Sequence, residues 1–190
     1  MIATTRRTSL THPLSIAELP VGANGGAIGV TFAPGKFQEN AMTGAWARDL
    51  DADLAAIHSW GARHLITLLE PYEFDELRIS SLPTQASDHG LMWYGLPITD
   101  GNAPDERFLS TWKELGPYLI RELLDGKRVV VHCKGGLGRA GTVASLLLLS
   151  TKTSSDAESA MLAVRTARPG AIETLEQERF VRKWAKALGQ

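Results

Sequence analysis

The sequence predicts an α/β domain in which a central, largely parallel sheet is flanked by helices. Apolar, β-branched runs that fit buried strands alternate along the chain with longer segments of helical periodicity, which is the pattern of strand–helix–strand units. The 190 residues suit one domain with a sizeable core. We see no repeat or linker, so we expect a flexible N-terminal end over residues 1–11 and one domain over residues 12–190.

The first elements are a predicted hairpin and a predicted helix. Residues 14–21 and 27–32 have the composition of short strands, and the glycine-rich residues 22–26 fit a turn between them. A dinucleotide-binding loop is the alternative for these glycines, but no helical pattern follows them directly. Apolar residues at helical spacing predict a helix from Trp46 to Ile57, and Gly61 is a plausible end for it.

Strands and helices continue to alternate to the end of the chain. We predict strands at 64–69, 91–98 and 129–132, a loop at 70–71, a short helix at 72–79, and longer helices at 104–124, 138–150, 155–165 and 174–188. Because the carboxyl ends of parallel strands meet at one edge of a sheet, the loops after 91–98 and 129–132 should lie close together.

One loop carries most of the chemical information. Residues 129–142, VVVHCKGGLGRAGT, contain the only cysteine of the chain, Cys133, and three of the five residues between it and Arg139 are glycine. Glycines let backbone amides approach an anion closely, and the following helix adds unpaired amides and a positive dipole end. A thiol held there should ionise easily, and Arg139 can bind a tetrahedral oxyanion through two parallel hydrogen bonds. The pattern predicts cysteine-dependent hydrolysis of phosphate monoesters.

The same segment resembles a known family. His-Cys-x5-Arg, at residues 132–139, is the signature of the protein tyrosine phosphatase superfamily, and this form looks most like the kinase-associated phosphatase branch of the dual-specificity enzymes. Residues 96–105 resemble the general-acid loop of that branch, and residues 170–177 resemble its C-terminal glutamine motif. The resemblance implies the Cys-x5-Arg phosphatase fold, phosphatase activity and a phosphocysteine intermediate.

The resemblance also implies three catalytic residues. Cys133 would be the nucleophile, Arg139 would hold the phosphate, and Asp100 would protonate the leaving oxygen and later deprotonate water. Asp105 competes for the acid role, but its place beside Pro104 suits a charge at the start of a helix. A buried structural cysteine is the alternative for Cys133, although it would not explain the glycines or the arginine.

Further residues are implied as the surroundings of these three. The loop positions assigned to substrate binding, together with Arg139, are Lys134, Gly135, Gly136, Leu137 and Gly138. His132 is expected to hydrogen-bond the loop and to tune the thiolate. Arg165 and Arg168 match an arginine-rich stretch of the family, and we expect them to support the loop or to form a secondary anion site.

The chain departs from the family pattern at two positions. Ala140 stands where relatives carry Ser or Thr, whose hydroxyl helps the thiolate to leave; Thr142 is a possible substitute. Glu173 stands where relatives carry Gln, whereas Gln177 keeps the second position of the motif. Such glutamines position water in relatives, and Glu173 either does this differently or only caps the last helix.

Several functions remain open at this level. The main hypothesis is a phosphatase acting on phosphotyrosine and phosphoserine or phosphothreonine in proteins, with a phosphorylated protein, a kinase among the candidates, as its partner. Lys134 suggests a phosphoinositide or other small-molecule substrate as an alternative. Ala140 suggests a weakly active module that binds phosphorylated partners. A sulfurtransferase is a fourth hypothesis, against which Asp100 argues.

Composition argues against other classes of partner. The formal net charge of −1 gives no general attraction to nucleic acid or anionic membranes, and no apolar run is long enough for stable membrane insertion. A single cysteine excludes an internal disulfide and a cysteine-based zinc cluster, and it fits a reducing, cytoplasmic location. The histidines lack metal-ligand spacing, so we expect neither a metal nor another cofactor.

Overall fold

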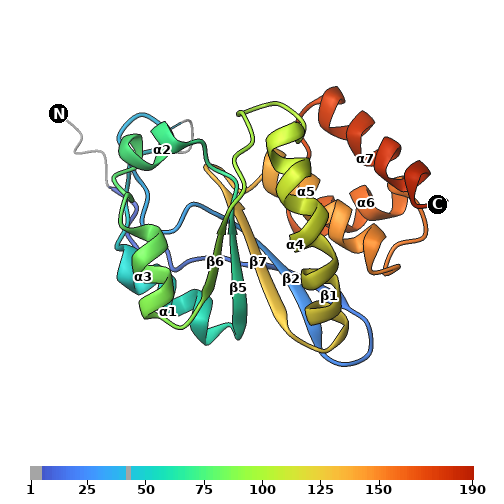
Figure 1. The fold of residues 1–190 in the computed structure, drawn as a ribbon. Helices are drawn as coiled ribbons and strands as arrows, with labels where there is room; N and C mark the ends of the chain where they lie inside the picture. The colour runs from blue at the N-terminus through green and yellow to red at the C-terminus, as the bar shows by residue number, and fades with distance from the viewer. Residues whose placement is uncertain (1–5, 42–43) are drawn as a thin grey trace.

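The computed structural model describes residues 6–41 and 44–190, and these form an α/β domain around a five-stranded sheet of order β1-β2-β7-β5-β6 (Figure 1). The strands are β1 (Ala17–Val21), β2 (Gly26–Phe32), β5 (Ala62–Thr67), β6 (Met92–Gly95) and β7 (Arg128–Cys133). β1 is antiparallel to β2, and the other pairings are parallel. The predicted fold class and hairpin are confirmed, and the dinucleotide-loop alternative is wrong.

Helices cover both faces of the sheet. On one side lie α1 (Leu50–Ser59), α2 (Pro71–Glu76) and α3 (Leu82–Asp88); on the other lie α4 (Glu106–Leu124), α5 (Gly138–Ser150), α6 (Ala157–Ala167) and α7 (Leu175–Ala187) (Figure 1). Each side has its own apolar core: Val130 of β7 belongs to one, whereas Val129 and Val131 belong to the other. Side chains alternate between the faces of a strand, so a strand buried on both faces is apolar throughout.

The centre of the sheet positions the cysteine loop. β7 lies between β2 and β5, and Cys133, its last residue, pairs in register with Phe32 of β2. On the far side of the loop, α5 is buried from Gly138 to Leu149. Both ends of the loop are therefore anchored in buried parts of the domain.

The helix predicted from Trp46 begins four residues later. Asp49 is the N-cap of α1, where its side chain accepts a hydrogen bond from the amide of Ala52. Trp46 lies instead in β4 (Trp46–Ala47), which pairs with β3 (Phe37–Gln38). Trp46 is buried and lies four residues before Leu50, so its position fits the helical spacing although it is not in the helix. The N-cap residue, Asp49, sets where the helix begins.

Two further elements differ from the prediction. The strand expected at 91–98 is shorter, because regular pairing covers only β6, although the amides of Leu96 and Ile98 still donate to carbonyls of the β5 end. Helix α3 was not predicted, since only Leu82 and Ala86 among its residues are buried. So short an apolar stripe gives little periodicity.

The described part of the N-terminal end contacts the β3–β4 sheet. The amide of Arg7 donates to the carbonyl of Ala45, its carbonyl accepts from Ala47, and its guanidinium lies 5.1 Å from the centre of the Trp46 ring. Residues 1–5 lie outside the described residues, so the flexibility expected for residues 1–11 stays a prediction.

A buried ion pair joins this region to α1. Arg48 Nε lies 2.7 Å from Asp53 Oδ2, and the two side chains are 0% and 1% exposed. Arg48 also donates to the carbonyl of His12, and Asp53 accepts from the amide of Gly35. The pair therefore links the N-terminal segment, the loop after β2 and the first turn of α1.

We expect Asp53→Asn to lower the free energy of unfolding by about 3–5 kcal/mol, because it leaves the buried Arg48 guanidinium without its counter-charge. Urea denaturation measures the change. Asp51→Asn is the matched control on the same helix, since the side chain of Asp51 is 79% exposed and an exposed pair contributes about 1 kcal/mol at most. Equal midpoint shifts in the two variants would contradict the assignment.

Candidate active site

The loop between β7 and α5 turns its carbonyl groups outward. Lys134 O accepts from the backbone that follows β2, at 3.3 Å. Gly135 O and Gly136 O each accept from the Arg168 guanidinium at 3.1 Å. A trans peptide points C=O and N–H to opposite sides, so the amides of residues 135–137 point to the inside of the loop. This arrangement leaves amide donors on the inside of the loop, as an anion site requires, and the predicted supporting role of Arg168 is confirmed.

Gly136 allows the loop to pack against β2. Its φ is +68°, and a Cβ at this position would lie 2.4 Å from the backbone carbonyl of Thr31. Neither the positive φ nor this approach suits a side chain. A Cβ at Gly135 would meet no atom within 4 Å. The space around the loop therefore excludes a side chain at residue 136 but not at residue 135.

Arg139 is held by a buried carboxylate. Its guanidinium donates from Nη1 to Glu73 Oε2 at 2.6 Å and from Nη2 to Glu73 Oε1 at 2.9 Å, and both side chains are at most 2% exposed. Burial alone would lower the pKa of Arg139, but the hydrogen bonds that it donates to Glu73 and the attraction of a thiolate at Cys133 raise it above its ordinary value. Arg139 is therefore a permanent, oriented cation.

The sequence interpretation missed Glu73. It lies in α2, which begins at Glu70-Pro71, where the amide of Glu70 donates to the Glu73 side chain in a capping box. The sequence signal was an ordinary helix start. Nothing in the local pattern distinguishes an acid that caps a helix from one that also reaches a distant arginine.

One edge of the Arg139 guanidinium faces the second predicted loop. Nη2 lies 3.1 Å from Asp100 Oδ1, and Nε is buried without a hydrogen-bond partner among the described residues. A buried donor without a partner is costly in a folded protein. Nε and Nη2 form the edge through which an arginine binds an oxyanion with two parallel hydrogen bonds.

Asp100 lies on a loop that is fixed from several sides. The hydroxyl of Thr99 donates to Glu70 at 2.9 Å. The hydroxyl of Thr174 donates to the carbonyl of Gly101, and Gln177 Nε2 donates to the next carbonyl along the chain. The carboxyl group of Asp100 remains 65% exposed, so a well-anchored loop presents an accessible acid next to Arg139.

Asp105, the competing acid, caps a helix. It is the N-cap of α4 and accepts from the amides of Arg107 and Phe108 at 3.0 and 3.4 Å. The hydrogen bond from the Arg107 side chain lowers the pKa of Asp105 below its ordinary value. Its interpretation as a charge at the start of a helix is confirmed.

His132 is a neutral, buried support. Burial lowers its pKa to about 3. Its Nε2 lies 2.7 Å from the hydroxyl of Thr67, which also accepts from the indole N–H of Trp93. A hydroxyl has one donor and two acceptor positions, so Thr67 can bond the ring and the indole at the same time. This contact joins His132 to β5, while a hydrogen bond with the backbone of Cys133, at the start of the loop, opposes the effect of burial on the pKa of His132.

The C-terminal motif holds loops together. Gln177 Oε1 accepts from the amides of Glu173 and Thr174 at 2.9 and 3.2 Å, and with Thr174 as N-cap it forms a capping box at the start of α7. Glu173 Oε2 accepts from the amide of Gly138 at 2.9 Å. Both residues lie beside the cysteine loop, and the Gln177 side-chain amide bonds three backbone groups.

Thr142 uses its hydroxyl inside α5. Its Oγ1 donates to the carbonyl of Gly138 at 2.8 Å and is buried, while Ala140 is 0% exposed. The structure therefore gives no support to Thr142 as a substitute for the hydroxyl that relatives carry at the position of Ala140.

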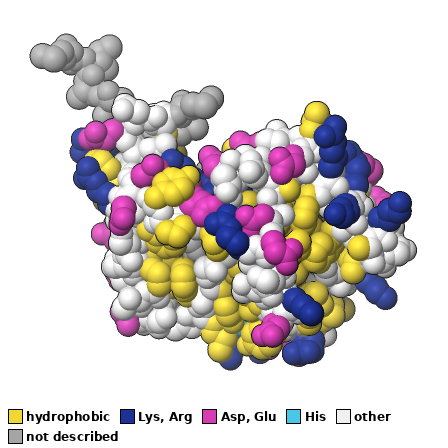
Figure 2. Space-filling view, turned by 45° about the horizontal axis from the view of Figure 1, so that its top comes forward, with side chains coloured by type: hydrophobic (Ala, Val, Ile, Leu, Met, Phe, Trp, Pro, Cys, Tyr) yellow, Lys and Arg dark blue, Asp and Glu magenta, His cyan; other side chains and the backbone are white. Residues whose placement is uncertain are grey.

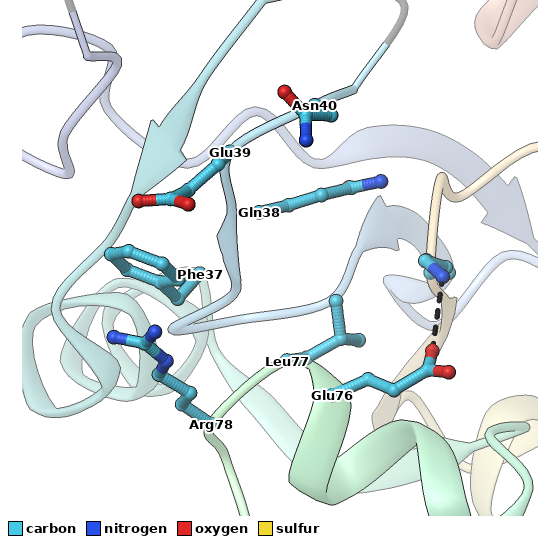
Figure 3. A pocket seen from close by; sticks show the side chains of 8 residues that line it. Phe37, Gln38, Glu39, Asn40, Glu76, Leu77 and Arg78 are labelled. Atoms are coloured by element: carbon cyan, nitrogen blue, oxygen red, sulfur yellow. Dashed lines mark hydrogen bonds and ion pairs between the residues drawn. The ribbon is translucent and has the colours of Figure 1, made fainter.

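The side chain of Lys134 faces a cavity beside the loop. Its Nζ lies 3.4 Å from Glu76 Oε2 (Figure 3). The cavity has a volume of about 560 Å³. Its other lining residues come from β3, the end of α2 and the segments that follow them: Phe37, Gln38, Glu39, Asn40, Leu77 and Arg78. The positive charge of Lys134 is thus paired, and the surface around the site carries charges of both signs (Figure 2).

Comparison with known proteins places the chain in a family. The family model described as "Swiss Army Knife protein, DSP-PTPase phosphatase domain" matches residues 40–181, and the chain belongs to this family of dual-specificity phosphatase domains. Cyclin-dependent kinase inhibitor 3 of Rattus norvegicus is 29% identical over 142 residues, which cover 74% of this chain and 66% of that protein. The Homo sapiens protein is 28% identical with the same coverage. The match therefore spans slightly less than two thirds of these relatives.

The structural comparison shows the same fold. Kinase associated phosphatase, solved with a serine in place of its catalytic-site cysteine, has a TM-score of 0.79 at 24% identity, covering 93% of this chain and 97% of that chain. The predicted family and fold are confirmed. In the described part of the chain no group of three or more His, Cys, Asp or Glu could hold a metal ion. None of the described helices is long and apolar enough to cross a membrane.

We expect Glu73→Gln to weaken tungstate binding about 10-fold or more, because an amide cannot accept from both guanidinium nitrogens and leaves Arg139 without its counter-charge. Titration calorimetry, at a temperature where circular dichroism shows the variant folded, measures the affinity. Asp75→Asn, an exposed position on the same helix, is the control and should bind tungstate as the wild type does. Unchanged affinity in Glu73→Gln would refute the role of Glu73.

Proposed function

We propose that this protein hydrolyses phosphate monoesters through a phosphocysteine intermediate. Cys133 Sγ attacks phosphorus, the ester P–O bond breaks, and Asp100 gives its proton to the leaving oxygen. Water then attacks phosphorus, Asp100 takes a proton from that water, and the P–S bond breaks to release phosphate and the thiolate. The observation that supports this scheme is the convergence of Asp100 on the Nε–Nη2 edge of Arg139, near the end of the strand that carries Cys133.

Arg139 and the loop supply the electrostatic part of the mechanism. The charge of the transferring phosphoryl group spreads over its equatorial oxygens, and fixed donors aimed at those oxygens stabilise the transition state. Arg139 Nε is a buried donor without a partner among the described residues, and the amides of residues 135–137 face the inside of the loop. These donors need no rearrangement when the substrate binds.

We infer that the substrate is a phosphorylated protein, with phosphotyrosine and phosphoserine or phosphothreonine as the reacting residues. The exposed Asp100 can reach leaving groups of different size, and the cavity beside Lys134 offers room for residues next to the phosphorylated one. The names of the relatives, cyclin-dependent kinase inhibitor 3 and kinase associated phosphatase, support a kinase as the partner. A cytoplasmic location remains part of this proposal, on the ground of the single unpaired cysteine.

The charge distribution favours this substrate class over phosphoinositides. A polyphosphorylated headgroup calls for several free cations around the loop. The Lys134 ammonium is paired with Glu76, and Arg168 donates to loop carbonyls. The carboxylate of Glu173, bound to the amide of Gly138, adds a negative charge on the same side.

We expect Cys133→Ser to reduce turnover of an aryl phosphate below detection and to retain tungstate binding, because a hydroxyl is a far weaker nucleophile while Arg139 and the loop amides remain. Steady-state assays and calorimetry on the same preparations separate the two properties. A serine variant that kept a substantial part of the wild-type rate would rule out the covalent mechanism.

We expect Asp100→Asn to slow alkyl phosphates most, by about 10²–10⁴-fold, and good aryl leaving groups much less, because a stable phenolate departs without full protonation. The measurement is kcat/KM across a leaving-group series. Asp105→Asn is the comparison variant, and its effect should not depend on the leaving group, since its carboxylate caps α4. An equal loss for every substrate in Asp100→Asn, or a selective loss in Asp105→Asn, would move the acid to another residue.

A further inference from the structure

A buried lysine that the mechanism does not use lies beside the nucleophile. Lys36, in the loop after β2, is 5% exposed. Its Nζ lies 3.4 Å from the carbonyl oxygen of Lys134 and 4.8 Å from the centre of the Phe32 ring. Lys134 follows Cys133 in the chain, and Phe32 is the residue opposite Cys133 in the β2–β7 ladder. The ammonium group therefore contacts both neighbours of the cysteine.

This ammonium has no carboxylate partner among the described residues. The described ion pairs include none with Lys36, whereas Arg48, the other buried cation of this cluster, is neutralised by Asp53 at 2.7 Å. The rings of Phe32 and Trp46 lie against Lys36 at 4.8 and 4.6 Å, and the attraction of their faces for a desolvated cation offsets only part of the cost of burying a charge. Burying a charge is costly unless an opposite charge is near. We therefore expect an anion other than a carboxylate close to the Lys36 ammonium.

A thiolate at Cys133 fits this requirement. It is the largest attraction on the Lys36 ammonium, whereas Arg48, Arg168 and Lys134 repel it. Burial lowers the pKa of Lys36 to about 8, and the charge of Cys133 opposes that effect. At neutral pH the ammonium is therefore still mostly protonated, and its charge acts on the cysteine.

We propose that Lys36 is a positioning residue of this active site, whose buried ammonium stabilises the thiolate of Cys133. The inference rests on the proposed function only in that the thiolate is the nucleophile. An opposite charge at short range favours the ionised form of a group, typically by 1–3 pKa units. The attraction is mutual, so removing either charge must shift the titration of the other by the same amount.

The first test is the pH dependence of alkylation by iodoacetamide, which reports on Cys133 because the chain has one cysteine. In Lys36→Met the ionisation midpoint of the thiol should rise, and the alkylation rate at pH 6 should fall about 10-fold or more. Lys36→Arg keeps the charge and should remain close to the wild type. Lys113→Met, at an exposed position of α4, should not differ from the wild type. A Lys36→Met midpoint equal to that of the wild type overturns the proposal.

Stability separates an electrostatic role from a structural one. The folded chain holds the Lys36 proton less tightly than the unfolded chain does. The charged ammonium therefore costs stability below about pH 8, and this cost is relieved as the pH rises toward 10.5. We expect Lys36→Met to have a Tm at pH 7 at least as high as that of the wild type. A lower Tm together with an unchanged thiol midpoint would show that Lys36 only fills space.

The reciprocal titration does not depend on the folding of Lys36→Met. In Cys133→Ser the Lys36 ammonium should lose its proton about one pH unit lower than in the wild type, followed by NMR of the lysine side-chain carbons and assigned with Lys36→Arg. An unchanged lysine titration overturns the proposal. These readouts need no substrate: a wild-type protein that fails to hydrolyse phosphate esters refutes the proposed function, whereas unshifted titrations in an active phosphatase refute the role of Lys36 alone.

Discussion

The buried pair between Arg139 and Glu73 is the contact on which the arrangement of the site depends. Glu73 accepts hydrogen bonds from two guanidinium nitrogens and fixes the plane of the guanidinium. Nη1 also donates a second hydrogen bond, to the carbonyl oxygen of Ile98, at 3.0 Å. One side chain thereby connects the start of α5, the helix α2 and the strand end that leads to Asp100. The guanidinium is always charged, so its burial requires Glu73, and its remaining edge is oriented before any substrate arrives.

The cysteine loop is held from outside so that its interior is free. Arg168 binds two of its carbonyls, and the amide of Ala33 together with Lys36 binds a third, that of Lys134. Each outward carbonyl turns the next amide inward. The conformation is thus maintained by groups from the loop after β2 and from the C-cap of α6. The loop itself contributes mainly its glycines, of which Gly136 alone closely approaches β2.

The C-terminal motif couples this loop to the acid loop. Thr174 and Gln177 donate to the carbonyls of Gly101 and Asn102, and Glu173 binds the amide of Gly138. Asp100 and the start of α5 are therefore supported by the same turn before α7. The carboxylate at position 173 is a departure from the family pattern, and its place at the loop amide gives it a contact with the phosphate-binding segment that a helix cap alone would not have.

The sequence by itself determined the fold class and the order of the two loops, because these follow from short-range patterns: strand runs, helical periodicity and a glycine-rich turn. It also indicated Cys133, Arg139 and Asp100 for the site, from the loop pattern together with the family resemblance. Tertiary structure decided the rest. Glu73 and Arg139 are 66 positions apart, and Lys36 lies 98 positions from the carbonyl it binds. A carboxylate or an ammonium is exposed or buried according to what packs on it, and local sequence carries no record of that packing.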